Sequence, residues 1–320
     1  MDIWGKAMKI LSMSGFVPEQ ICDTVRFDQY TGDRNISHYC GYASDFISQV
    51  LADDSIDGAV YPKSCDSTRI ISTYLQDSGK FMYQINVPSY NNDGAEEFYA
   101  SSIKHYKETL EKYYGVSIDD IIDRTKKING RNAAIQDSYE NIANISYTDY
   151  LSRIHDILKM PLDRQIWDGN FAVRRATEKT VFIVGSFLSN IKIVEKMEEV
   201  GMTVVGDSLT ESGRLVSTPP VDVSGDIYKG IAHSILSARL SPTQNCFEKI
   251  VENDIIEISK KKAKGVIFII QKYCEPYEYL FSIYKSKLKE LGVRILKLSL
   301  NDTEDDRKVM LALEGFSDIL

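Results

Sequence analysis

Short apolar runs alternate along the chain with longer stretches in which apolar residues recur every three or four positions. The short runs are rich in β-branched and aromatic residues and predict buried strands, whereas the longer spacing predicts helices. Strands and helices that alternate in this way are typical of parallel sheets covered by helices. We expect strands at residues 58–62, 81–88, 180–186, 202–208, 265–273 and 293–300.

A long stretch without strand character separates the two early strands from the four late ones. Between residues 94 and 160 the apolar positions keep a helical spacing, which predicts helices that close one domain and lead to the next. Charged residues gather in "WDGNFAVRRATEK" (167–179), directly before a new strand. We therefore predict an α/β protein of two domains, residues 1–170 and 171–320, each with a Rossmann- or flavodoxin-like parallel sheet, joined by a helical region.

Composition and charge narrow the class of protein. The 320 residues are 43% hydrophobic and 26% charged, which is typical of a soluble globular chain. A formal net charge of −8 provides no basic field for nucleic acid. No apolar stretch reaches the roughly 18 residues of a membrane helix, and the first twenty residues lack a signal-peptide pattern. We expect a cytoplasmic protein that binds neither nucleic acid nor membranes.

The predicted strands also indicate where a ligand would bind. "TVFIVGSFLSNIKIVEKMEEVGMTVVGDS" (180–208) predicts a strand, a turn, a helix and a second strand, which is one complete parallel crossover. Ligands in such sheets bind beyond the carboxyl ends of the strands. This rule selects "PKSCDST" (62–68), "GSFLSN" (185–190), "GDSLTESGR" (206–214) and "YCEPYE" (273–278).

Cysteines occupy two of these four segments. The chain has five cysteines, Cys22, Cys40, Cys65, Cys246 and Cys274, and their odd number and wide spacing argue against a disulfide framework. Cys40, Cys65 and Cys274 each lie just before a helical pattern, where backbone N–H groups and the helix dipole stabilise a thiolate. Three such thiolates could together bind a soft metal. No CxxC spacing supports one, and cysteines that only pack in a core remain the alternative.

Several segments, in order along nearly the whole chain, resemble one known family. They are "GFVPEQI", "YCGYASDFISQVL", "IDGAVYPKSCDSTRIISTYL", "YQINVP", "VGSFLSNIKIVEKMEEVGMTVVGDSL" and "AKGVIFIIQKYCEPYEY". The most specific are Pro-x-x-Cys-Asp-Ser at 62–67 and Lys-Tyr-Cys-Glu-Pro-Tyr at 272–277. The chain resembles the subunits of 2-hydroxyacyl-CoA dehydratases and of the related benzoyl-CoA reductases, in particular the 2-hydroxyglutaryl-CoA dehydratase D-component.

The resemblance implies an iron–sulfur cluster, usually of the 4Fe-4S type, at the interface between two α/β domains. Carried over to this sequence, the ligands are Cys40, Cys65 and Cys274, and the fourth iron is open to water, hydroxide or substrate. It also implies an acyl-CoA substrate, a homologous second subunit or a second copy of the chain, and a separate ATP-dependent iron–sulfur activator protein.

The implied reaction is that of a lyase. The activator supplies one low-potential electron, which reaches the thioester carbonyl, and the resulting ketyl radical anion expels the 2-hydroxyl group. Deprotonation and return of the electron make the reaction redox-neutral. The alternatives are a subunit of a benzoyl-CoA reductase-type or other low-potential reductase, a non-catalytic electron relay or accessory partner, and a cluster-free α/β binding module.

Two departures from the family pattern leave the acyl substrate open. Gln20 replaces the usual leucine, and "CDTV" (22–25) stands where a small-residue turn is expected. Near "LSPTQNCFEKI" the family often has a Cys-Pro-Cys-like stretch, of which only Cys246 remains. We leave Cys246 out of the ligand set.

Other polar residues are weaker candidates for the site. Ser12, Ser14 and Glu19 lie near the expected substrate entrance, although serine and a glutamate at a helix start are also common caps. His38 precedes Cys40 by two residues and is a candidate for proton transfer or for a hydrogen bond to cluster sulfur, with a surface histidine as the alternative.

The turn at Gly185 and Ser186 is a candidate for binding a phosphate of coenzyme A, because it comes before a predicted helix start. Tight packing of the turn is the alternative reading of the same residues.

Overall fold

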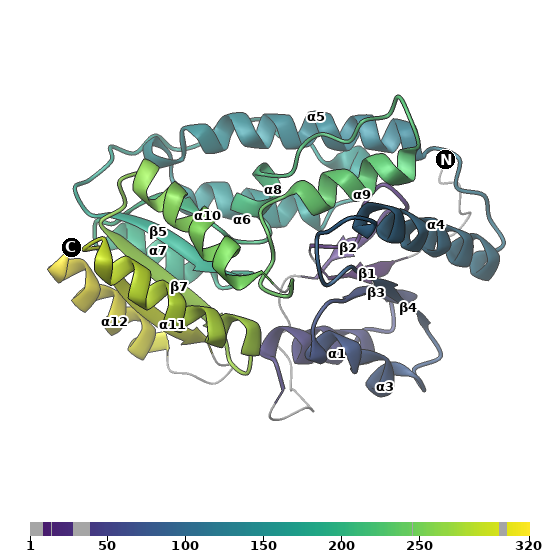
Figure 1. Cartoon of the computed structure of the whole chain (residues 1–320), viewed down its shortest axis with the longest axis horizontal. Coiled ribbons are helices and arrows are strands. Elements are labelled where there is room, and N and C mark those ends of the chain that lie inside the picture. The colour runs from purple at the N-terminus through teal and green to yellow at the C-terminus, as the bar shows by residue number, and fades with distance from the viewer. Residues whose placement is uncertain (1–8, 14, 28–38, 245, 301–305) are drawn as a thin grey trace.

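The computed structural model describes residues 9–13, 15–27, 39–244, 246–300 and 306–320. These residues form two four-stranded sheets in which all paired strands run parallel. The two sheets lie next to each other, each with its own helices, and a long helix runs along both (Figure 1). The predicted α/β class with two parallel-sheet domains is confirmed.

The first sheet has the strand order β2-β1-β3-β4. Its strands are β1 (Ile10–Ser12), β2 (Val25–Arg26), β3 (Gly58–Lys63) and β4 (Phe81–Asn86). The helices α1 (Gly41–Ala52) and α3 (Ile71–Leu75) cover one face, and α4 (Ala95–Tyr114) and α9 (Ile227–Ser237) cover the other.

The second sheet repeats this plan with the order β6-β5-β7-β8. Its strands are β5 (Thr180–Gly185), β6 (Thr203–Asp207), β7 (Gly265–Gln271) and β8 (Arg294–Leu300). On one face pack α6 (Tyr147–Leu158), α7 (Ile191–Glu199) and α12 (Asp306–Ile319), and on the other α10 (Phe247–Lys260) and α11 (Glu275–Glu290).

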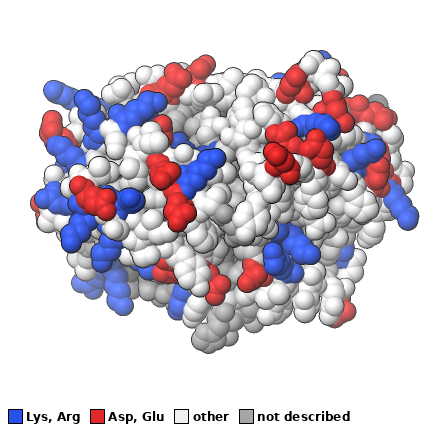
Figure 2. Space-filling model, in the orientation of Figure 1, with Lys and Arg blue, Asp and Glu red and all other residues white. Residues whose placement is uncertain are grey.

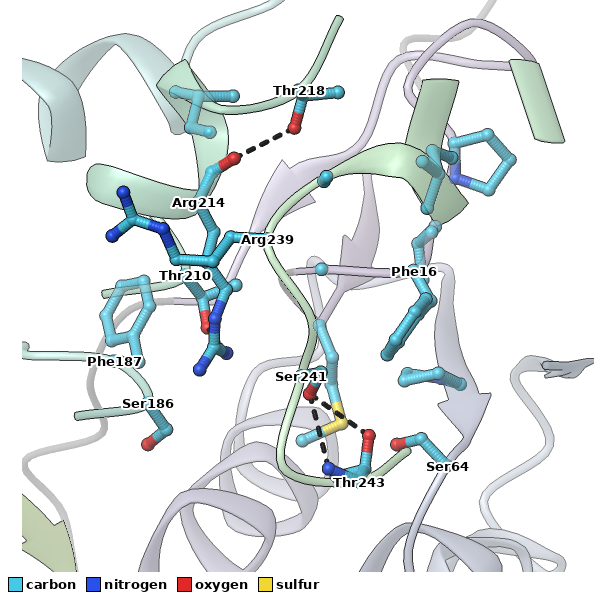
Figure 3. Close-up of a pocket in the computed structure, with 18 of the residues that line it drawn as sticks. Phe16, Ser64, Ser186, Phe187, Thr210, Arg214, Thr218, Arg239, Ser241 and Thr243 are labelled. Carbon is cyan, nitrogen blue, oxygen red and sulfur yellow. Dashed lines mark hydrogen bonds between the residues drawn. The ribbon is translucent and has the colours of Figure 1, made fainter. Parts of the chain in front are cut away.

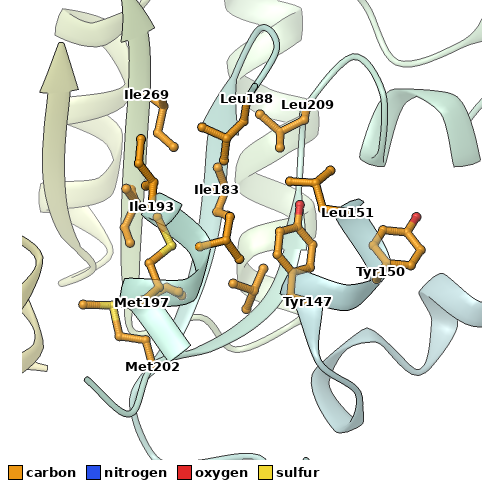
Figure 4. Close-up of a cluster of buried hydrophobic side chains, with 14 of the residues drawn as sticks. Tyr147, Tyr150, Leu151, Ile183, Leu188, Ile193, Met197, Met202, Leu209 and Ile269 are labelled. Atoms are coloured by element: carbon orange, nitrogen blue, oxygen red, sulfur yellow. The ribbon is translucent and has the colours of Figure 1, made fainter. Parts of the chain in front are cut away.

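Burial on both faces explains the continuous apolar runs of the central strands. Along β7, Ile267 and Ile269 pack toward the side of α6 and α7, whereas Phe268 and Ile270 pack toward α10 and α11. Successive side chains of a strand point to opposite faces, so a strand covered on both sides must be apolar at every position. Figure 4 shows the first of these cores, in which side chains of α6, α7 and β5 interdigitate.

Both sheets reverse their strand order at the same relative place. In the first sheet β2 lies on one side of β1 and β3 on the other. In the second sheet β6 lies on one side of β5 and β7 on the other. Such a reversal leaves a crevice at the carboxyl ends of the two strands, because the following connections leave in opposite directions. The fold therefore contains two crevices of this kind.

Long connections tie the two sheets together. The helix α5 (Ile121–Glu140) follows α4 and contributes Ile135 and Tyr139 to the core of the second sheet. In the reverse direction, α9 comes after β6 but contributes Ile231 and Leu236 to the core of the first sheet. The domain boundary between residues 170 and 171 stays a prediction. A helix before it, α5, packs on the second sheet, and a helix after it, α9, packs on the first. The short helices are α2 (Asp66–Arg69), α8 (Gly213–Val216), η1 (Ile142–Asn144) and η2 (Leu162–Arg164).

The six predicted strands and the helical stretch at 94–160 are confirmed. The sequence analysis missed β1 and β2, which have three and two residues and give too short an apolar run. Among the described residues no helix is long and apolar enough to cross a membrane. On the face drawn in Figure 2, acidic and basic side chains are interspersed rather than gathered by sign.

Candidate functional site

A cavity of about 210 Å³ lies where the carboxyl ends of the two sheets meet. The loops after β1, β3, β5 and β6, the start of α11 and the segment after α9 all contribute to its wall. Figure 3 shows Phe16 of the first domain across the cavity from Phe187, Thr210 and Arg214 of the second. The cavity thus joins the crevices at which the strand orders reverse.

Three of the five cysteines line this cavity: Cys40, Cys65 and Cys274. Each is the residue directly before a helix, Cys40 before α1, Cys65 before α2 and Cys274 before α11. The sequence analysis predicted these positions at helix starts. Only the three-dimensional structure brings them to one cavity.

The loop that carries Cys274 is a tight turn. Tyr273 adopts a left-handed backbone with φ of 62°, and the backbone N–H of Cys274 donates to the Gln271 carbonyl at 3.0 Å. Pro276 lies in the first turn of α11, where its missing N–H costs no helical hydrogen bond. The Gly41 N–H donates to the Lys272 carbonyl at 3.2 Å, which fastens the start of α1 to this turn.

The thiols of Cys40 and Cys274 lie close together, and each affects the pKa of the other. This contact lowers the pKa of Cys40, whereas the same contact together with burial raises the pKa of Cys274. Cys65 is close enough to interact electrostatically with both other thiols, and its sulfur lies 3.7 Å from the Thr68 hydroxyl. Burial raises the pKa of Cys65.

Thiolates are the ligands of iron–sulfur clusters, and the structure can be compared with what such a cluster needs. Among the described residues no three His, Cys, Asp or Glu side chains are arranged to bind one metal ion. A four-iron cluster instead takes each thiolate at a separate iron, so its cysteines need only face a common space. Cys40, Cys65 and Cys274 all line the cavity, and the cluster itself stays a prediction.

The other two cysteines lie apart from the cavity. Cys22 is buried in the first domain with its sulfur 3.1 Å from the Tyr106 hydroxyl, and burial raises its pKa to about 11. Cys246 packs against the core between the second sheet and α10. Neither residue lines the cavity.

Glu19 lines the cavity as the centre of a buried ion cluster. Its carboxylate binds the guanidinium groups of Arg26 and of Arg131, the latter at 2.7 Å. Burial alone would raise the pKa of Glu19, but the two guanidinium groups lower it to about 2. Glu19 is therefore ionised at neutral pH, and its predicted part in catalysis stays a prediction.

The remaining polar candidates are placed as follows. Ser12 ends β1, and its hydroxyl donates to Thr24 Oγ1 at 2.8 Å rather than lining the cavity. Ser14 and His38 lie outside the described residues.

Gly185 is the last residue of β5, and Ser186 lines the cavity. A Cβ atom on Gly185 would lie 3.0 Å from the Ile269 carbonyl oxygen and 3.1 Å from Leu209, so close packing explains this glycine. The helix α7 starts only at Ile191, which separates the Gly-Ser turn from the helix N-terminus. Phosphate binding at this turn stays a prediction.

Three arginines of the cavity wall were missed as site residues: Arg26 in β2, Arg214 in α8 and Arg239 after α9. The Arg214 guanidinium donates to the Tyr277 hydroxyl at 2.8 Å, and Tyr277 in turn donates to the Gly185 carbonyl at 2.6 Å. Arg239 donates to the Asp207 carbonyl at 2.7 Å. Arg214 falls in one of the four segments selected after predicted strands. No sequence signal marks Arg239.

Comparison with known proteins agrees with the resemblance noted in the sequence. The beta subunit of (R)-phenyllactyl-CoA dehydratase from Clostridium sporogenes is 23% identical over 83% of this chain and 76% of its own length. The beta subunit of lactoyl-CoA dehydratase from Anaerotignum propionicum is 18% identical over 100% of this chain and 86% of its own.

Among solved structures, a chain described as "crystal structure of SsGBP and GDP complex" is matched with a TM-score of 0.27 and 10% identity over 98% of this chain and 99% of that one. The family described as "2-hydroxyglutaryl-CoA dehydratase, D-component" matches residues 8–320. With nearly its whole length matched, the chain belongs to the 2-hydroxyglutaryl-CoA dehydratase D-component family.

Proposed function

We propose that this chain is the iron–sulfur subunit of a 2-hydroxyacyl-CoA dehydratase, a lyase that removes water from a 2-hydroxyacyl thioester. The observation that carries the proposal is the meeting of Cys40, Cys65 and Cys274 at one cavity between the two domains. These residues would hold a 4Fe-4S cluster. When bound, the cluster would supply a low-potential electron and an iron that is open to an oxygen ligand.

The other residues of the cavity would bind the thioester and exclude water. Phe16, Phe187 and Tyr277 place aromatic surface along the wall, which favours a dry site. Glu19 would keep its charge through the reaction, because Arg26 and Arg131 hold it ionised.

Two proteins would assist this chain. Both relatives are named as beta subunits, which supports a homologous companion subunit in a heterodimer. The electron would come from a separate ATP-dependent iron–sulfur activator.

Iron binding tests the assignment of the three cysteines. We expect Cys40→Ser, Cys65→Ser and Cys274→Ser each to lower the iron and acid-labile sulfide of the anaerobically reconstituted chain sharply, since each removes a ligand. Cys246→Ser is the matched control, because Cys246 also precedes a helix, α10, yet does not line the cavity. Equal iron in all four variants would reject the assignment.

Turnover tests the reaction. With the companion subunit, the activator and ATP, we expect loss of water from a member of a panel of 2-hydroxyacyl-CoA thioesters. Reduction of an aryl-CoA instead would indicate a reductase subunit, and bound iron without any turnover would indicate an electron relay.

A further inference from the structure

Arg214 is a buried cation that no described carboxylate contacts directly, and the Asp254 carboxylate acts on its charge from beyond salt-bridge distance. The residue is only 9% exposed and lines the cavity. Its guanidinium contacts two hydroxyl groups, Thr210 Oγ1 at 3.3 Å and Tyr277 Oη at 2.8 Å, and its Nε has no hydrogen-bond partner. Across the described part of the chain, no carboxylate lies within salt-bridge distance of it. A buried charge without a counter-charge is costly, so such a group is normally paired with an ion.

The two hydroxyl groups do not neutralise this charge. Burial raises the pKa of Tyr277 well above its usual range, so its phenol is neutral at physiological pH and offers only a dipole. Thr210 is neutral at any pH. The guanidinium therefore has hydrogen-bonding capacity left over for a ligand, because an arginine carries five N–H donors in a planar fork.

Arg239 places a second guanidinium at the same wall. Its side chain is 13% exposed and lines the same cavity, and in Figure 3 the two guanidinium groups point in different directions. The Ser217 hydroxyl links the two residues, since it donates to the Arg214 carbonyl at 2.8 Å and accepts from the Arg239 N–H at 2.9 Å. The carboxylate nearest to Arg239 is that of Asp254, at 3.8 Å, and it also accepts a hydrogen bond from Tyr284 at 2.6 Å.

Asp207 does not supply the missing anion. Its carboxylate already accepts four hydrogen bonds, from the backbone N–H groups of Leu209 and Gly213 and from the hydroxyls of Tyr147 and Ser212. Arg239 contacts only the Asp207 backbone carbonyl. Among the described residues, the Asp254 carboxylate acts on both guanidinium groups, so two buried cations share one carboxylate.

We propose that Arg214 and Arg239 form a buried subsite for an oxyanion, a carboxylate or a phosphate group of the bound ligand. Paired guanidinium groups bind such planar or tetrahedral anions through charge-assisted hydrogen bonds. The subsite adjoins the cysteines, because Tyr277 lies in the first turn of α11, directly after Cys274. The naming of a thioester as the ligand rests on the proposed function. Two sources of the anion fit, a terminal carboxylate on the acyl group and a phosphate of coenzyme A.

Calorimetric titration of the full-length chain under anaerobic conditions tests the subsite without turnover. The ligands are glutaryl-CoA, butyryl-CoA, coenzyme A and 3′-dephospho-coenzyme A. We expect Arg214→Gln and Arg239→Gln each to weaken binding on the order of 30-fold, the usual scale for removal of a buried charged partner. Arg153→Gln is the control, because Arg153 contacts Asp168 and the Phe171 ring rather than the cavity.

The pattern of losses identifies the source of the anion. If the acyl carboxylate occupies the subsite, the wild type prefers glutaryl-CoA to butyryl-CoA and the variants lose that preference. If a phosphate occupies it, the variants lose affinity for all four ligands alike. If that phosphate is the 3′-phosphate, the affinity for 3′-dephospho-coenzyme A does not change in the variants. Unchanged affinities in Arg214→Gln and Arg239→Gln would overturn the proposal.

A second measurement separates this proposal from the dehydratase function and covers variants that fold poorly. Inorganic phosphate and glutarate are expected to raise the thermal midpoint of the wild type and of Arg153→Gln, with a smaller rise in Arg214→Lys and in Arg239→Gln. If the wild type binds no thioester but its thermal midpoint rises with these anions, the subsite proposal stands and the dehydratase proposal fails. If the wild type shows neither thioester binding nor the rise in thermal midpoint, the subsite proposal fails as well.

Discussion

Glu19 illustrates how a buried charge is kept ionised. A carboxylate removed from water is stable only when opposite charges and hydrogen bonds replace its hydration. Arg26 and Arg131 provide both, and Arg131 is itself nearly fully buried, with its side chain 3% exposed. The cluster joins the loop after β1 to α5, so it also fixes one wall of the cavity.

Replacement of Glu19 by glutamine should lower the free energy of unfolding at pH 7 by about 3 kcal/mol, because it leaves two guanidinium groups without their counter-charge. The pKa of Glu19 is lowered from 4.5 to about 2 in the folded chain. Its stabilising contribution is therefore complete above about pH 4.5 and is lost as the pH falls toward 2. Urea titrations of the wild type and variant at several pH values measure this effect.

The difference between the two proteins should shrink as the pH falls through this range, and a difference independent of pH would contradict the ion-cluster explanation. Asp163→Asn serves as control. Its pair with Lys127 is largely exposed, so we expect little change in stability.

The turn from β6 into α8 shows how an element positions a site residue. The Asp207 carboxylate binds the backbone N–H groups of Leu209 at 2.9 Å and of Gly213 at 2.7 Å, so the turn folds back on the end of its own strand. A Cβ atom on Gly213 would overlap the Asp207 carbonyl group. Glycine is required there by the close approach of two backbones, and the next residue is Arg214.

Gly213→Ala should therefore destabilise the chain by about 2 kcal/mol or more, because the turn must open to admit the methyl group. Gly130→Ala is the matched comparison. Gly130 lies within α5, and a Cβ there meets no atom within 4 Å. We expect it to stabilise the chain by about 0.5–1 kcal/mol, since alanine favours a helix. Thermal unfolding of the two variants measures both effects, and equal stabilities would contradict the packing argument.

Over the whole molecule, the two sheets share helices that come from opposite parts of the sequence. Asn129 of α5 bonds in both directions with the backbone of Val221, donating at 2.9 Å and accepting at 3.0 Å. Val221 leads into α9, which covers the first sheet, whereas α5 reaches the second. Unfolding of one sheet would expose apolar surface of the other.

We therefore expect one cooperative unfolding transition in urea, followed by Trp fluorescence and by far-UV circular dichroism. Asn129→Ala should lower the midpoint, at a cost of about 1–2 kcal/mol for two backbone partners left unpaired, without splitting the transition. Asn170→Ala, at an exposed position, is the control. Two separated transitions in the wild type would show that the sheets unfold independently.

Much of the fold could be predicted because its signals are local. The central strands, such as β7, are apolar almost throughout, and the helices between 94 and 160, such as the 20-residue α4 and α5, keep a regular apolar spacing. The strands β1 and β2 were missed because pairing with β3 and with each other, not their own residues, makes them strands.

The sequence by itself determined six of the eight described strands, β3 to β8, the long helices, and the placement of Cys40, Cys65 and Cys274 at helix starts, since these depend on neighbouring residues and on short-range hydrogen bonds. Only the tertiary structure decided that the three thiols share a cavity, that Glu19 pairs with Arg131 at a separation of 112 residues, and that Arg214 is buried with no described carboxylate in direct contact. Those contacts arise from the packing of two sheets, and burial and the electrostatic surroundings of a side chain are set by residues distant in the chain.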